Sequence, residues 1–206
     1  MKKVLVLLGV MLFSASAFAL NAEVTMDKNC ASQKAEFEQY VASQKNTSFI
    51  VQNILINLSD PMETMSDDEA MPKALCYATY QVKGRPLVAF VRANAEIFPG
   101  DISKKEAKKL YNFADRVEIL NEKAEFDRVV AMGNDSYVVQ HILGNMADPM
   151  KQMSDEQARP KAKAYAAFKV NGKSFVEFVR DHSNDYTMDV EIDMEVFADR
   201  VERLAK

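Results

Sequence analysis

The stretch "DPMKQMSDEQARPK" at Asp148–Lys161 nearly repeats an earlier stretch, "DPMETMSDDEAMPK" at Asp60–Lys73. Around these two stretches, residues 49–92 align with residues 137–180 without a gap, and 23 of the 44 positions are identical. Chance does not produce this level of identity within one chain. The sequence therefore contains an internal duplication, and the duplication sets the fold expected for the whole molecule.

The duplication extends beyond this aligned region in both directions. "KAEF" at 34–37 recurs at 123–126 after a shift of one residue, and "FADRVE" at 113–118 recurs at 197–202 after a shift of four. A period of this length is too long for the two-helix units of common solenoid repeats. We therefore expect each copy to form a small domain of its own.

The predicted organisation is a signal peptide at 1–19, an N-terminal arm at 20–32, a first repeat module at 33–121 and a second at 122–206. We expect the two modules to pack as a pseudo-symmetric pair, and beads joined by a linker are the alternative. No stretch rich in Gly, Pro or Ser separates them at the junction, Leu120–Glu122. This composition is compatible with a helix that runs through the junction.

The first residues have the pattern of a secretory signal. Lys2 and Lys3 form a basic start, Val4–Phe13 is an apolar core, and Ala17 and Ala19 fit the small-x-small cleavage pattern. The apolar run is too short for a membrane span. We predict cleavage after Ala19 and a periplasmic or secreted protein without stable membrane insertion, with an uncleaved anchor as the alternative.

The charge of the chain limits the class of partner. Loss of Lys2 and Lys3 with the leader removes two positive charges and changes the formal net charge from −4 to −6. An acidic protein lacks the positive surface that binds phosphate backbones or anionic lipid. We therefore expect no nucleic-acid partner, and the expected partner is an unknown protein or small ligand.

Two cysteines, Cys30 and Cys76, remain after cleavage. In an exported protein a disulfide between them is the default prediction, with a redox pair or two free thiols as alternatives. The chain has no C-x-x-C motif, which argues against redox chemistry. Closing this loop would stabilise the fold by about 3–4 kcal/mol. Ala164 stands in place of Cys76 in the second copy, so the disulfide would attach the arm to the first module only.

Hydrophobic periodicity predicts three main helices in each module. Their expected ranges are 33–44, 49–58 and 103–120 in the first copy, and 123–132, 137–146 and 194–205 in the second. A shorter helix is expected after Ser66 and after Ser154, because both begin an S-x-x-E/Q capping box. The Asp-Pro pairs at Asp60 and Asp148 are expected to break the preceding helix, and Pro72 and Pro160 to end or kink the short one.

The segments 75–92 and 163–180 favour a β-hairpin. Apolar residues alternate along them, and Asn171-Gly172 suits a two-residue type I′ turn. A helix is the alternative, since the shared apolar positions also lie on one helical face. A further strand is expected at 188–192, where apolar and acidic residues alternate. The predicted fold class is α+β, a tandem duplication of an α-α-β-β-α module, with an all-α fold as the alternative.

The sequence contains no recognisable catalytic motif. His141 and His182 are the only histidines, both lie in the second copy, and no nucleophile motif accompanies them. We expect both to be partly exposed surface residues. The prediction is therefore a protein that is not an enzyme and has no cofactor, although a site that forms only in three dimensions remains an alternative.

The paired methionines suggest a possible metal site. Met62 and Met65 recur as Met150 and Met153, and thioether sulfur atoms are soft ligands that suit Cu(I). Core packing is the favoured interpretation, because these residues continue a helical stripe and methionine fills irregular gaps. A periplasmic copper-handling protein is the alternative function.

Four polar residues are candidates for ligand binding: Arg92, Arg180, Gln52 and Gln140. Each occupies the same place in both copies. The arginines close an apolar run and are positioned to meet an anion or a partner's carboxylate. Pairing with Asp115 or Asp199 is the structural alternative. The leading functional hypothesis is an exported, non-catalytic, two-repeat binding or interaction protein, with its site between the copies or in an equivalent groove on each.

Overall fold

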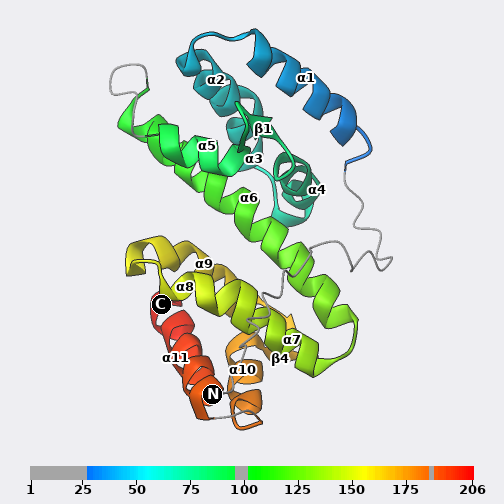
Figure 1. Cartoon of the computed structure of the whole chain (residues 1–206), viewed down its shortest axis with the longest axis vertical. Coiled ribbons are helices and arrows are strands. Elements are labelled where there is room, and N and C mark those ends of the chain that lie inside the picture. Colours follow the sequence, from blue (N-terminus) through cyan, green and yellow to red (C-terminus); the bar gives the residue numbers. More distant parts are fainter. Residues whose placement is uncertain (1–26, 96–101, 186–187) are drawn as a thin grey trace, which may run out of the picture.

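The computed structural model describes residues 27–95, 102–185 and 188–206 of the chain, with the side chains of 188–192 outside this description. Over these residues the molecule is nearly all helical (Figure 1). Its β-structure consists of two hairpins with two strands each. The prediction of an α+β fold is therefore wrong, and the all-α alternative describes the molecule.

The first copy begins with a helix that the disulfide holds. Its elements are α1 (Cys30–Ser43), α2 (Thr47–Ile54), the π-helix η1 (Leu55–Ser59), α3 (Asp60–Glu63), α4 (Asp67–Tyr77), β1 (Gln81–Val82), β2 (Arg85–Pro86), α5 (Leu87–Asn94) and α6 (Lys104–Ala131).

The second copy uses the end of α6 in place of α1 and then repeats the same order. Its elements are α7 (Asp135–His141), the π-helix η2 (Ile142–Ala147), α8 (Asp148–Lys151), α9 (Asp155–Ala167), β3 (Lys169–Val170), β4 (Lys173–Ser174), α10 (Phe175–Ser183) and α11 (Met188–Ala205).

The long helix α6 connects the two copies. It has 28 residues, starts at a capping box formed by Ser103 and Glu106, and passes without interruption through the predicted junction at 120–122. Figure 1 shows it running diagonally from the upper group of helices into the lower group. Buried residues form one cluster from Cys30 to Leu120 and a second from Phe126 to Leu204. One rigid helix thus belongs to both cores.

The expected hairpins exist, but they are far shorter than predicted. Each strand has two residues, and the turn residues Lys83, Gly84, Asn171 and Gly172 all have positive φ, as a type I′ turn requires. A helix begins directly after each hairpin, whereas residues 78–80 separate α4 from β1 and residue 168 separates α9 from β3. Residues 75–77 therefore belong to α4 and residues 87–92 to α5, because burial on helix faces outweighs the strand propensity of Val, Phe and Tyr.

The Asp-Pro pairs do not break the helix that precedes them. The chain passes from α2 through η1 into α3, and from α7 through η2 into α8, and a proline stands near the start of α3 and of α8. A proline has no N–H and its ring clashes with the carbonyl four residues earlier. The wider π-turn provides space for the ring, which is the physical reason why the predicted break is absent.

The helix ends expected at Pro72 and Pro160 and the strand expected at 188–192 are absent, while the alternative that these prolines kink the helix stays a prediction. Pro72 and Pro160 lie inside α4 and α9, which continue to Tyr77 and Ala167. Each proline stands near the helix start, where only a single backbone hydrogen bond is lost. The strand expected at 188–192 is instead the first turns of α11. The predicted capping boxes at Ser66 and Ser154 are both present.

Aromatic pairs occupy corresponding places in the two cores. Phe37 stacks on Tyr80 with ring centroids 5.0 Å apart, and Phe126 stacks on Phe168 at 5.2 Å. The first pair joins α1 to the residues that follow α4, and the second joins α6 to the residues that follow α9. These contacts place the second half of α6 in the role that α1 has in the first copy.

The predicted disulfide is confirmed. Cys30 and Cys76 are bonded, with their Cα atoms 5.6 Å apart, and the bond ties the first turn of α1 to the last turn of α4. None of the helices within the described ranges combines the length and the apolar character that a membrane crossing needs.

Candidate binding cleft

Arg116 on α6 explains why the methionine stretch recurs. Its guanidinium donates to the backbone carbonyl oxygens of Met62 and Met65, the latter at 2.7 Å, and to Asp67 Oδ1 at 2.8 Å. These carbonyls belong to the turn between α3 and α4, where helical hydrogen bonding ends. One arginine therefore donates hydrogen bonds to carbonyl oxygens that lack a helical partner, and it holds the turn against α6.

Arg200 on α11 makes the same contacts in the second copy. It donates to the carbonyl oxygens of Met150 and Met153, the latter at 2.6 Å, and to Asp155 Oδ1 at 3.1 Å. The shared Asp-Arg pair and the shared Met-x-x-Met-Ser-Asp stretch are thus two halves of one interaction. Sequence reasoning singled out both halves but did not connect them.

The side chains of the methionine pairs are largely in the core. Met62 and Met150 are each only 1% exposed, and Met65 and Met153 are partly buried against the same clusters. The described residues contain no group of three His, Cys, Asp or Glu side chains arranged to hold a metal ion. These positions agree with the packing interpretation, and copper binding stays the alternative that a titration tests.

Arg92 and Arg180 form equivalent ion pairs. Arg92 Nη2 lies 2.7 Å from Asp115 Oδ1 and 2.6 Å from Glu118 Oε2. Arg180 Nη2 lies 2.7 Å from Asp199 Oδ1 and, in the same fork, 2.9 Å from Glu202 Oε2. Both arginines therefore pair with the aspartate of the final helix, which is the structural alternative to ligand binding. Neither presents an unpaired cation to a ligand.

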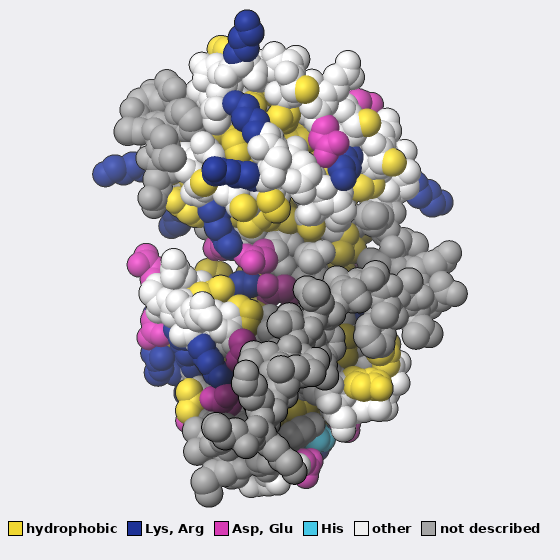
Figure 2. Space-filling view, viewed as in Figure 1, with side chains coloured by type: hydrophobic (Ala, Val, Ile, Leu, Met, Phe, Trp, Pro, Cys, Tyr) yellow, Lys and Arg dark blue, Asp and Glu magenta, His cyan; other side chains and the backbone are white. Residues whose placement is uncertain are grey.

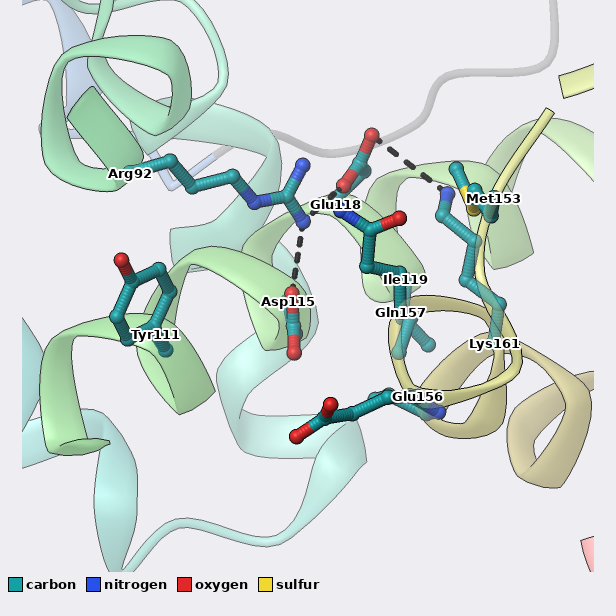
Figure 3. Close-up of a pocket in the computed structure, with 10 residues that line it drawn as sticks. Arg92, Tyr111, Asp115, Glu118, Ile119, Met153, Glu156, Gln157 and Lys161 are labelled. Carbon is teal, nitrogen blue, oxygen red and sulfur yellow. Dashed lines mark hydrogen bonds and ion pairs between the residues drawn. The ribbon is translucent and has the colours of Figure 1, made fainter. Parts of the chain in front are cut away.

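Only Arg92 borders a cleft between the two copies. The cleft has a volume of about 610 Å³ and is lined by Arg92, Tyr111, Asp115, Glu118, Ile119, Met153, Glu156, Gln157, Pro160 and Lys161. Figure 2 shows acidic and basic side chains gathered where the two halves of the molecule meet. The first five residues come from α5 and α6, and the others precede or lie on α9 (Figure 3).

Lys161 is the buried cation of this cleft and is only 5% exposed. Its ammonium pairs with Glu122 and lies 3.5 Å from Glu118 Oε1. Glu122 also accepts a hydrogen bond of 2.7 Å from the hydroxyl of Tyr165. Burial, with the Glu122 carboxylate beside it, raises the pKa of Tyr165, so the hydroxyl stays protonated and donates.

Glu118 connects the two cations. Its carboxylate contacts Arg92 with one oxygen and Lys161 with the other, as the dashed lines in Figure 3 show. Arg92 belongs to the first copy and Lys161 to the second. This carboxylate therefore joins the copies electrostatically at the back of the cleft.

The cleft has one carboxylate that no cation neutralises. Glu156 is exposed, lines the cleft, and has no ion pair or hydrogen bond with the described part of the chain. Gln157 beside it accepts from the backbone of Ser154 as part of the capping box. Apolar surface comes from Ile119, Met153 and Pro160, so the lining combines a negative charge with an apolar wall.

The remaining sequence candidates lie elsewhere. Gln52 on α2 is partly buried and Gln140 on α7 is exposed, and neither lines this cleft. His141 Nδ1 is 3.1 Å from the amide of Asn145, and its partial burial lowers the pKa of its ring. His182 Nδ1 is 2.9 Å from the carbonyl oxygen of Phe178. In the described residues neither histidine is hydrogen-bonded to a serine or a cysteine.

Sequence reasoning missed most of the cleft. Glu118, Ile119 and Glu122 lie at the junction between the copies, and Glu156 follows the N-cap Ser154. In the sequence these residues are explained by helix formation and helix capping, so nothing marks them as binding residues. The shared Lys73/Lys161 position was one available signal. A lysine kept in both copies beside buried alanines of its helix marks a position worth inspection for an ion pair, and Lys161 forms one. Comparison of the chain with known protein families, with curated proteins and with solved structures finds no match.

Proposed function

We propose that the chain is an exported, non-catalytic binding protein with two repeats, and that the cleft between the copies holds its ligand. The cleft formed jointly by both copies is the observation that carries this proposal. Concave sites with an apolar wall and a few polar groups are typical of ligand binding, and they occur preferentially between domains. The basic start of the chain, the apolar run after it and the disulfide support export.

The charges of the lining favour a ligand with a positively charged group. Arg92 and Lys161 are already neutralised by carboxylates, whereas Glu156 has no cation beside it. An amine or guanidinium placed in the cleft would pair with Glu156. Its apolar part would cover Ile119 and Met153. An alkyl amine, a polyamine or a basic side chain of a partner has this chemistry.

A thermal-shift measurement with cadaverine, spermidine and arginine tests the proposal. Binding to the folded state raises the melting temperature with ligand concentration. We expect at least one of these amines to stabilise the wild-type protein, and the substitution Glu156→Gln to abolish the shift. Asp68→Asn is the matched control. Glu156 stands in the first turn of α9 and Asp68 in the first turn of α4, so both substitutions remove a negative charge that interacts with a helix dipole.

Asp68 occupies the same place in the first copy and does not line the cleft. Its substitution should leave the amine-dependent shift intact. Equal loss of the shift in both variants, or no shift with any of the three amines, would contradict the proposed ligand chemistry. A hydrolytic activity of the purified protein that His141→Asn removes would contradict the non-catalytic function.

A further inference from the structure

The two copies differ at one buried polar cluster. In the second copy Lys161 and Tyr165, one helical turn apart on α9, both bond to the carboxylate of Glu122 on α6. The stacked pairs Phe37–Tyr80 and Phe126–Phe168 set the correspondence between the copies. On this correspondence Lys73 and Tyr77 on α4 match the lysine and the tyrosine, and Gln33 on α1 matches Glu122.

The first copy therefore has the cation and the hydroxyl, but within the described residues no carboxylate is bonded to either of them. The amide of Gln33 donates to Asp27 Oδ2 at 3.4 Å. Lys73 has no ion pair or hydrogen bond with the described part of the chain, and the same holds for the hydroxyl of Tyr77. Lys73 is partly exposed, whereas Lys161 is buried.

The disulfide explains why the first copy does without this carboxylate. Cys30 and Cys76 covalently join α1 to α4, which are the helices that correspond to the second half of α6 and to α9. Ile119 and Ala164 stand at the matching places of the second copy, so there the helices are joined by the Lys161–Glu122–Tyr165 cluster instead. Lys73 and Tyr77 are therefore free of this structural role.

Lys73 and Tyr77 line a groove of about 380 Å³ between α1, α2, η1 and α4. The rings of Phe37 and Tyr80 form part of its wall, and the amides of Asn53 and Asn57 lie along it. Its lining thus offers the ammonium of Lys73, phenols, three amides, the carboxylate of Glu36 and aromatic surface. Burial, with the Asp27 carboxylate nearby, raises the pKa of Tyr77, so its hydroxyl is available as a donor at neutral pH.

We propose that this groove binds the carboxylate of a small organic acid with an apolar part, in the place that the Glu122 carboxylate occupies in the second copy. The ammonium of Lys73 and the hydroxyl of Tyr77 hold the carboxylate, and the aromatic rings contact the apolar part. A charge-assisted hydrogen bond to a lysine is stronger than a neutral one, so the acid is distinguished from its amide.

One acidic residue lines the groove, and a second, Asp27, lies close enough to act on the Tyr77 hydroxyl. Glu36 lines the groove and accepts a hydrogen bond of 3.2 Å from Ser32. Glu125 stands at the matching place on α6, near the Glu122–Lys161 pair of the second copy. A carboxylate at this place is therefore compatible with a second carboxylate bound to the lysine.

Calorimetric titration of the purified protein with N-acetylphenylalanine, and in parallel with its uncharged amide, tests the proposal. We expect the acid to bind and the amide to bind at least tenfold more weakly. Lys73→Met should abolish binding of the acid, and Tyr77→Phe should weaken it. Glu156→Gln should leave it unchanged, so that failure here and failure at the cleft between the copies are separate results.

A second variant keeps the test independent of folding defects. Gln33→Glu places a carboxylate of the chain itself next to Lys73 and Tyr77, as in the second copy, and should reduce the affinity for the acid at least tenfold in a folded protein. Gln39→Glu adds the same charge at an exposed position of α1 and should not change binding.

Two results would overturn the proposal. One is equal affinity for the acid and the amide, or an affinity that Lys73→Met does not change. The other is a concentration-dependent dimer in sedimentation that Lys73→Met dissolves, because the carboxylate at Lys73 would then come from a second copy of the chain.

Discussion

At the scale of single residues, buried and half-buried cations organise this molecule. Arg116 and Arg200 each satisfy the carbonyls of one turn, while Arg92 and Lys161 hold carboxylates of α6. An arginine suits the first task because its planar fork donates in several directions at once. The side chains of the methionine stretch suggest packing or metal binding. Its backbone carbonyls explain why Asp67 and Arg116 recur as Asp155 and Arg200.

Arg200→Met should destabilise the second copy. The carbonyls of Met150 and Met153 would lose their donor, and we expect a loss of about 2–3 kcal/mol in the free energy of unfolding. Guanidinium denaturation measures the change. Arg203→Met is the matched control, because Arg203 is exposed and pairs with Asp155 alone, and it should cost less than about 0.5 kcal/mol. Similar losses in the two variants would contradict this role of Arg200.

His141 should make stability depend on pH. Burial lowers the pKa of His141 in the folded protein below its ordinary value of 6.5, so the unfolded chain takes up a proton first as the pH falls. Stability is therefore retained above about pH 6.5 and decreases below it. His141→Asn, which installs the residue of the first copy, should reduce the difference in unfolding free energy between pH 7.5 and pH 5.5. An unchanged difference would refute the assignment.

The methionine pairs should not bind Cu(I). Met62 and Met150 are buried in the two cores, and a metal bound to their sulfur atoms would require the turn to open. Met65 and Met153 are the more accessible members of the pairs. We expect that substituting both with leucine leaves the Cu(I) affinity of the protein unchanged in a competition titration with a chromogenic chelator. A weakened affinity would support the copper-handling alternative.

At the scale of elements, turn residues determine where each hairpin turns, and helix packing determines how short its strands are. The positive φ angles of Asn171 and Gly172, +51° and +83°, were anticipated from the Asn-Gly pair. The length of the strands was not, because alternating apolar residues also fit a helix face over so few residues. Helices therefore flank each hairpin, since α4, α5, α9 and α10 each bury an apolar face against the final helix of their copy.

Gly172→Ala should destabilise the second hairpin by about 1 kcal/mol. Space is available for a methyl group, so the cost comes from the left-handed backbone conformation alone. Gly144→Ala provides a control of opposite sign. Gly144 lies in η2, and an alanine there meets nothing within 4 Å. This variant should stabilise the protein by roughly 0.5–1 kcal/mol in urea denaturation. The same sign for both variants would contradict the assignment.

At the scale of the whole molecule, two separate cores share one helix. Each cluster of buried residues lies within one copy, and α6 contributes its first half to one core and its second half to the other. This arrangement fixes the two copies along a common axis and places the cleft beside α6. The disulfide stabilises only the first copy, and the ionic cluster around Glu122 only the second.

Reduction of the disulfide should therefore loosen one half of the molecule. Cys30 and Cys76 close a loop of sequence separation 46, and their replacement by alanine should destabilise the first copy by about 3–4 kcal/mol. Hydrogen exchange should accelerate over α1 to α5 and remain slow over α9 and α10. Uniform acceleration along the whole chain would show that the two cores unfold as a single unit.

The candidate site was predictable only in part. The alternative partners of Arg92 and Arg180 were anticipated, because arginine and aspartate recur together at fixed places in both copies. The cleft was not anticipated, because Ile119 and Glu156 come from segments that each have a sufficient local explanation. They meet only because α6 continues through the junction and brings α9 beside the first copy.

The sequence by itself determined the duplication, the disulfide, the capping boxes and the positive-φ turns. Each of these depends on covalent identity or on the conformational preference of a few neighbouring residues, which does not change with distant context. Only the tertiary structure decided between helix and strand at 75–92, the π-turns before the prolines, and the carboxylate partner of Lys161. These features depend on the burial of surfaces far apart in the sequence, and that energy exceeds the small differences in local propensity.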